Sequence, residues 1–195
     1  MPKLNQQAMR QRREHIVDAA IRQFAKQGFG GSSVDAICAE AGISKGAFYT
    51  HFESKDAVML ELLARRGAIY DAIAASTLAE FEEMFFDLML RGLSDVDSRL
   101  EVEAVTIGAS NDAIKQALIA NSERCERRLS EVIGELLADG KIEMVDAVTP
   151  VEAASMLYTY ASGRLSLHVY ETANKDREAR RGLAITLAGL VRAPG

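Results

Sequence analysis

The chain has 195 residues, of which 48% are hydrophobic and 26% are charged, a balance that excludes wholesale disorder. Its two cysteines are too few for a disulfide framework, and no CxxC pair is present to suggest a zinc site. No run of 18 apolar residues predicts a membrane span, and the N-terminal residues lack the apolar stretch of a secretory signal. We therefore expect reduced thiols and a cytoplasmic protein.

The charge is distributed unevenly along the chain. The formal net charge is −5, yet residues 1–56 contain eight Lys and Arg against six Asp and Glu. An acidic body with a basic head is the asymmetry expected when one end faces a polyanion such as DNA. Four basic residues open the chain and either contact DNA as an arm or form a solvated tail: Lys3, Arg10, Arg12 and Arg13.

The apolar residues of the first 75 positions recur with helical spacing and predict four helices. The first covers about residues 10–27 and ends at a glycine-rich stop, because glycine tolerates the left-handed exit conformation. Ser33 caps a second helix over 34–41, Gly42 ends it, and Ser44 caps a third over about 45–51. A longer fourth helix follows over about 55–75.

The second and third helices, joined by a tight glycine turn, form a helix-turn-helix. Phe48 and Phe52 are four residues apart and are expected to hold the third helix against Phe24 and Ile37. The opposite side has small or polar residues that suit a major groove about 12 Å wide. The residues expected to face DNA, at bases, at phosphates or at a helix N-terminus, are Ser33, Ser44, Lys45, Gly46, Ala47, Tyr49, Thr50, His51 and Lys55. His51 equally suits a cation at the C-terminal end of a helix.

The segment GFGGSSVDAICAEAGISKGAFYTHFESK, residues 28–55, resembles the DNA-binding head of the TetR/AcrR transcriptional regulators. The resemblance covers about residues 10–60 and implies an all-helical homodimer whose heads read DNA and whose bodies hold a small-molecule pocket. It also implies phosphate contacts at Ser33, Tyr49 and Lys55, with the outward residues of 45–50 at base edges. In the body, residues 100–137 are weakly similar to the BetI branch, but no aromatic cage for choline is evident.

Beyond residue 75, helices are expected near 78–93, 98–108, 112–138, 151–172 and 176–191, and no segment alternates with the period of a strand. The predicted fold class is therefore all-α: an N-terminal three-helix DNA-binding head, residues 1–54, and a larger helical ligand-binding and dimerisation body, residues 55–195. An effector pocket is expected among Met84, Phe85, Leu88, Met89, Val105, Leu118, Asn121, Cys125 and Tyr158, although such stripes also suit plain core.

Apolar stripes on the last two helices predict a four-helix interface with a second copy of the chain. Its expected members are Met156, Tyr160, Gly163, Leu167, Tyr170, Leu183, Leu187 and Leu190. The alternative is that both stripes belong to the core of the single chain.

Motifs for catalysis are missing from the sequence. It has no paired Glu-x-x-His, no GxSxG, no HExxH, no phosphate loop and no dinucleotide fingerprint. We therefore expect no enzyme, no cofactor and no metal. The predicted function is a ligand-responsive transcriptional repressor, released from a palindromic DNA operator by a small, largely apolar effector. The alternative is a helical ligand-binding or scaffolding dimer without operator binding.

Overall fold

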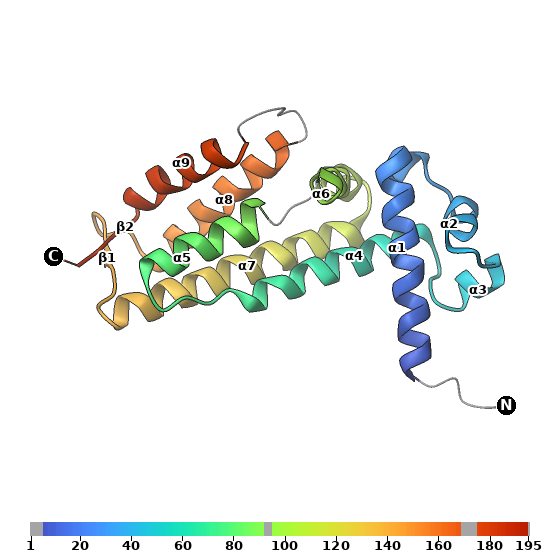
Figure 1. Cartoon of the computed structure of the whole chain (residues 1–195), viewed down its shortest axis with the longest axis horizontal. Helices are drawn as coiled ribbons and strands as arrows, with labels where there is room; N and C mark the ends of the chain where they lie inside the picture. The colour runs from blue at the N-terminus through green and yellow to red at the C-terminus, as the bar shows by residue number, and fades with distance from the viewer. Residues whose placement is uncertain (1–5, 92–94, 169–174, 195) are drawn as a thin grey trace. The chain divides into compact units, whose positions relative to one another are not determined.

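The computed structural model describes residues 6–91, 95–168 and 175–194, which are almost entirely helical (Figure 1). The helices are α1 (Gln6–Gly31), α2 (Val34–Ala41), α3 (Lys45–Tyr49), α4 (Lys55–Ile69), α5 (Leu78–Phe85), α6 (Asp95–Gly108), α7 (Asp112–Ala138), α8 (Pro150–His168) and α9 (Lys175–Ala188). A 3₁₀ turn, η1 (Tyr70–Ala72), follows α4, and a π-helical segment, η2 (Phe86–Arg91), follows α5. The all-α fold class is confirmed.

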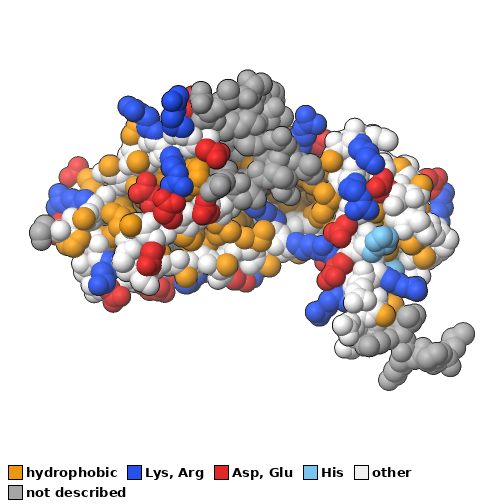
Figure 2. Space-filling view, in the orientation of Figure 1, with side chains coloured by type: hydrophobic (Ala, Val, Ile, Leu, Met, Phe, Trp, Pro, Cys, Tyr) orange, Lys and Arg blue, Asp and Glu red, His pale blue; other side chains and the backbone are white. Residues whose placement is uncertain are grey.

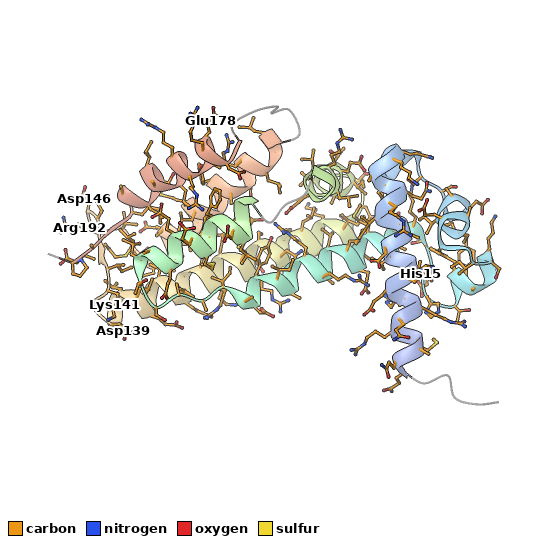
Figure 3. The ribbon with its side chains drawn as sticks, in the orientation of Figure 1. His15, Asp139, Lys141, Asp146, Glu178 and Arg192 are labelled. Atoms are coloured by element: carbon orange, nitrogen blue, oxygen red, sulfur yellow. The ribbon has the colours of Figure 1, made fainter. Side chains whose placement is uncertain are left out.

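The strands in the described residues form a single two-stranded antiparallel pair, β1 (Glu143–Met144) with β2 (Val191–Arg192). The sequence predicted a helix as far as residue 191, whereas α9 ends at Ala188. Strands of two residues are too short to show an alternating pattern, so periodicity could not reveal them. Glu143 and Arg192 also form an ion pair across the two strands, with Arg192 labelled in Figure 3.

Packing divides the chain into two compact units. One comprises the described parts of residues 1–65 together with 99–118, and the other those of 66–98 and 119–195. The predicted division at residue 54 concerns function and stays a prediction. It did not foresee that most of α6 belongs to the same unit as the helix-turn-helix.

The first unit is organised around α1. Its apolar side is fully buried through Ile16, Val17 and Phe24. Gly28 has a φ of 71°, in the left-handed region, and breaks the helix where the glycine-rich stop was predicted. The turn that follows buries Phe29, whose ring centroid is 5.2 Å from that of Phe24. A carboxylate oxygen of Glu103, on α6, accepts the Phe29 amide at 2.5 Å.

The second unit is a bundle of α5, η2, α8 and α9 with most of α7. In Figure 1, α8 and α9 lie side by side, and both contact η2. Its core contains the largest buried side chains of the unit: Tyr70, Ile73, Phe81, Phe85, Phe86, Leu129 and Ile133. The predicted helix over 55–75 ends early, at Ile69, because the chain turns through η1 and buries Tyr70 and Ile73.

Replacing Phe48, which is completely buried in the first unit, should destabilise the protein strongly. We expect Phe48→Ala to lower the free energy of unfolding by about 3–5 kcal/mol through lost burial and the cavity left behind. The neighbouring Tyr49→Ala, at a side chain 54% exposed, should cost far less, about 1 kcal/mol or below. Urea unfolding followed by circular dichroism measures both, and equal losses would contradict the packing described here.

Candidate nucleic-acid interface

The helix-turn-helix is held by hydrogen bonds at both ends of α2. The Ser33 hydroxyl accepts the Ala36 amide at 3.1 Å and caps the N-terminus. At the other end, Gly42 has a φ of 63°, so its amide and that of Ile43 turn back to the carbonyls of Ala39 and Cys38 at 3.2 and 3.0 Å. This is a Schellman arrangement, and it sets the direction in which the chain enters α3.

The third helix is short, and its orientation depends on aromatic burial. The Ser44 hydroxyl caps α3 by accepting the Ala47 amide at 3.2 Å. Phe48 and Phe52 are both buried, with ring centroids 5.9 Å apart. With these two rings fixed in the core, the remaining residues of the helix must face outward, as the sequence predicted.

The outward side of α3 is open. Lys45, Gly46, Tyr49 and Thr50 are exposed and Ala47 is half-buried. A Cβ added at Gly46 would meet nothing closer than the Ser44 hydroxyl at 3.8 Å, so another surface can approach the backbone closely there. The Tyr49 ring stands edge-on to Phe48, with the ring centroids 5.5 Å apart, and Tyr49 is 54% exposed.

Two of the cations expected to meet DNA already have partners in the protein. The Lys45 ammonium lies 2.6 Å from an Asp35 carboxylate oxygen, and this hydrogen bond raises the pKa of Lys45. The Lys55 ammonium donates to the carbonyls of Phe29 and Ser32 at 2.6 and 2.9 Å and lies 4.1 Å from the centre of the Phe29 ring. Lys55 therefore stabilises the turn before α2, and a phosphate contact from it stays a prediction.

Arg13 has a structural role that the sequence analysis missed. Its guanidinium donates to Glu61 at 2.8 and 3.1 Å and to the His51 carbonyl at 2.6 Å, and lies 4.1 Å from the Phe52 ring centroid. The signal was present, because Arg13 precedes Ile16 and Val17 by three and four residues and so shares their face of α1. Lys3, at the start of the proposed arm, lies outside the described residues.

A second cluster neutralises other basic residues of α1. Glu40 accepts hydrogen bonds from Arg22, Gln23 and Lys26 at 2.7, 2.9 and 2.8 Å. The bonds from Lys26, Arg22 and Gln23, in that order of size, lower the pKa of Glu40 to about 2. On the face drawn in Figure 2, basic and acidic side chains are accordingly interspersed over this unit. The positive charge counted from the sequence is therefore partly compensated within the head.

The residues predicted to line an effector pocket do not lie in one unit. Phe85 and Cys125 are in the core of the second unit, with Met84, Leu88 and Tyr158 packed against it. Asn121 in the same unit lies against Gly67, where an added Cβ would clash with its amide.

Three other members of that predicted set are placed differently. Val105 and Leu118 belong to the first unit; Val105 is 61% exposed and Leu118 lies against Gly108. The Met89 side chain lies outside the described part of the chain.

The residues predicted for a dimer interface also separate into two groups. Met156, Gly163 and Leu167 are exposed on α8. The α9 and C-terminal leucines are instead buried in the core of their own unit: Leu183, Leu187 and Leu190. These three leucines therefore fit the alternative that the stripe belongs to the core of the single chain. The exposed side of α9 carries Ile185 instead. Tyr160 is half-buried and donates to the Ala179 carbonyl at 2.7 Å, and Tyr170 lies outside the described residues.

Known proteins share this head. The model of bacterial regulatory proteins of the tetR family matches residues 16–62, from α1 to α4. The head of the chain, residues 16–62, is therefore that of a TetR-family regulator. The match to YerO, an uncharacterized regulator of Bacillus subtilis, is 50% identical over 52 residues but covers only 27% of this chain and 18% of that protein. The residues that match the family model lie in the head, which is thus a TetR-type helix-turn-helix DNA-binding domain.

Two longer matches extend over the body. The transcriptional regulator AcrR of Shigella flexneri is 24% identical over 205 residues, which covers 96% of this chain and 93% of AcrR. The crystal structure of FadR of Bacillus subtilis, in complex with stearoyl-CoA, superposes with a TM-score of 0.75 at 18% identity, covering 90% of this chain and 98% of FadR. At that identity the structural likeness concerns the fold.

Other kinds of site were sought in the described residues. No group of three His, Cys, Asp or Glu side chains there is placed to hold a metal ion. None of the described helices is long and apolar enough to cross a membrane.

The Glu40 cluster predicts a specific acid sensitivity. Because the folded pKa of Glu40 is about 2 against an ordinary 4.5, its stabilisation is present above pH 4.5 and is lost as the pH falls toward 2. Glu40→Gln should therefore be less stable than the native protein at pH 7, and the difference in urea midpoint should shrink between pH 5 and pH 3. A difference that stays constant over this range would show that the Glu40 charge does not contribute.

Proposed function

We propose that this chain, with its TetR-type head, is a homodimeric, ligand-responsive transcriptional repressor that leaves a palindromic operator when a small, largely apolar effector binds. The observation that carries the proposal is the open, small-residue side of α3, which buried Phe48 and Phe52 turn away from the protein. A helix of this kind can enter a major groove, where Lys45 and Thr50 offer polar groups and Gly46 and Ala47 allow close approach.

A second copy of the chain is supported by the surface of the second unit. Four large hydrophobic side chains are exposed on α8 and α9: Val151, Met156, Leu167 and Ile185. Large apolar side chains left exposed on the last two helices are typical of an interface, and a two-fold dimer would present two heads to half-sites about 34–36 Å apart.

An effector in the body is supported by composition and by a relative. The core of the second unit is edged by half-buried Met84, Leu88 and Tyr158, which are adaptable or amphipathic side chains suited to an apolar ligand. FadR, with the same fold, was crystallised with stearoyl-CoA. The effector would act by binding more tightly to a conformation whose heads no longer match the operator spacing.

A mobility-shift titration with the DNA that flanks the chain's own gene tests the proposal directly. The full-length protein should shift that DNA, sediment as a dimer, and discriminate against unrelated DNA of equal length. A scaffolding or ligand-binding dimer would sediment identically and shift neither DNA, which would reject operator binding.

Tyr49 should contribute a phosphate contact. Tyr49→Phe removes only the exposed hydroxyl and should weaken binding to operator and unrelated DNA alike, by about threefold to tenfold. The slope of affinity against salt should change little, because a neutral donor releases few counterions. Fluorescence anisotropy at several salt concentrations measures both quantities, and an unchanged affinity would remove Tyr49 from the interface.

The ion pair between Asp35 and Lys45 should lower the affinity of the protein for DNA. Asp35→Asn removes the ion pair at 2.6 Å and a negative charge beside the reading helix, so DNA affinity should rise about threefold or more at low salt. Lys45→Ala should instead change the preferred operator sequence, measured by selection from a randomised half-site. An Asp35→Asn protein that binds no tighter would show that the ion pair does not compete with DNA.

A further inference from the structure

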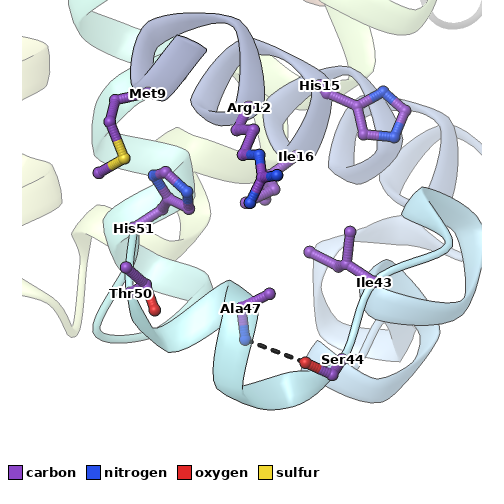
Figure 4. A pocket seen from close by; sticks show the side chains of 9 residues that line it. All are labelled: Met9, Arg12, His15, Ile16, Ile43, Ser44, Ala47, Thr50 and His51. Carbon is purple, nitrogen blue, oxygen red and sulfur yellow. Dashed lines mark hydrogen bonds between the residues drawn. The ribbon is translucent and has the colours of Figure 1, made fainter. Parts of the chain in front are cut away.

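The first unit contains a pocket of about 370 Å³ between α1 and α3 (Figure 4). Four of its lining residues come from α1 and five from the turn before α3, from α3 itself and from the two residues after it. They are Met9, Arg12, His15, Ile16, Ile43, Ser44, Ala47, Thr50 and His51. The volume falls in the range of small-molecule sites, about 300–1,000 Å³.

The polar groups of this pocket are suited to an anion. Figure 4 shows the Arg12 guanidinium pointing into the pocket, with His51 on one side and Ser44 below. Within the described part of the chain no lining residue is acidic, and no carboxylate pairs with Arg12. The adjacent Arg13, in contrast, is engaged by Glu61 and the His51 carbonyl. A free guanidinium offers parallel N–H donors that match the two oxygens of a carboxylate.

The remaining walls of the pocket are apolar, so the rest of the anionic ligand should be apolar too. Met9, Ile16, Ile43 and Ala47 supply aliphatic and thioether surface around the charged group. His15 is fixed at the edge, because its Nε2 lies 2.9 Å from the Ala41 carbonyl at the end of α2. Its position on α1 is labelled in Figure 3.

We propose that this pocket binds a small aromatic or aliphatic monocarboxylate and that the bound anion competes directly with DNA. Ser44, Ala47 and Thr50 line the pocket and also belong to the side of α3 that would enter the major groove. One surface cannot hold both partners, so a ligand here acts without any change in the body. The binding site rests on the pocket alone, while the competition rests on the proposed function.

Nuclear magnetic resonance of the histidine rings tests the binding without DNA. Benzoate, titrated at constant pH and ionic strength, should move the imidazole signals of His15 and His51, which both line the pocket, saturably. Benzamide, of nearly the same shape but neutral, should not produce saturable shifts. Absence of saturation with benzoate, or equal shifts with benzamide, would overturn the anion site.

Two arginine variants provide the matched comparison. Arg12→Gln should weaken benzoate binding at least about tenfold, since a charge-assisted bidentate pair is lost. Arg10→Gln removes the same charge from an exposed position of α1 that does not line the pocket and should bind benzoate as the native protein does. Equal weakening in both variants would indicate only a general effect of charge.

Competition is then measured by DNA anisotropy with benzoate against sodium chloride at the same ionic strength. Benzoate should raise the apparent DNA dissociation constant in proportion to its concentration for the native protein and for Arg10→Gln, but far less for Arg12→Gln. If the native protein binds no DNA while benzoate still saturates the histidine shifts, the proposed function fails and the anion site stands. If DNA binds and benzoate does not compete, the direct competition is wrong.

Discussion

The burial of Phe48 and Phe52 is the constraint on which the head depends. An α-helix of five residues has too few internal hydrogen bonds to be stable alone, so tertiary packing must hold α3 in place. The two rings do this from one side, while the Ser44 cap fixes the first turn. Arg13 holds the residues just after α3, because its guanidinium both donates to the His51 carbonyl and stacks on the Phe52 ring. The outward residues are thus oriented by two buried rings, one cap and one arginine.

Several basic residues of the first unit are paired with acidic residues of the same unit. Basic residues near DNA are costly when DNA is absent, because like charges repel in the compact state. Here Glu40 neutralises Arg22 and Lys26, Glu61 pairs with Arg13, and Asp35 pairs with Lys45. The Glu40 and Glu61 pairs tie α1 to α2 and to α4. The Asp35–Lys45 pair is exposed on the reading side, so it can exchange for a phosphate or base at small cost.

Local signals in the sequence were sufficient for the head and for the helical class. Serine caps, glycine stops and helical spacing act within a few residues, so Val34–Ala41 and Asp112–Ala138 were predicted with their observed bounds. Partners distant in sequence were not accessible in this way. The interaction of Glu103 with Phe29 spans 74 residues, and nothing in either segment predicts the other.

In the body, helical periodicity alone could not predict which residues are buried. Its last helix has apolar residues on more than one side, and periodicity cannot tell which side meets the chain's own core. Packing decides this: Leu183 and Leu187 are buried, and Ile185 is left exposed between them. Periodicity likewise gave no sign that Val105 and Phe85 belong to different units.

The shortness of α3 also explains why one surface can serve two purposes. With Phe48 buried, every other residue of the helix lies on or beside the reading side, including those that border the pocket of Arg12. A longer helix could separate a ligand-contacting turn from a base-contacting turn, whereas five residues make little more than one turn. Any group that fills this pocket must therefore touch residues that DNA would need. The overlap follows from helix length alone and does not require the head to move.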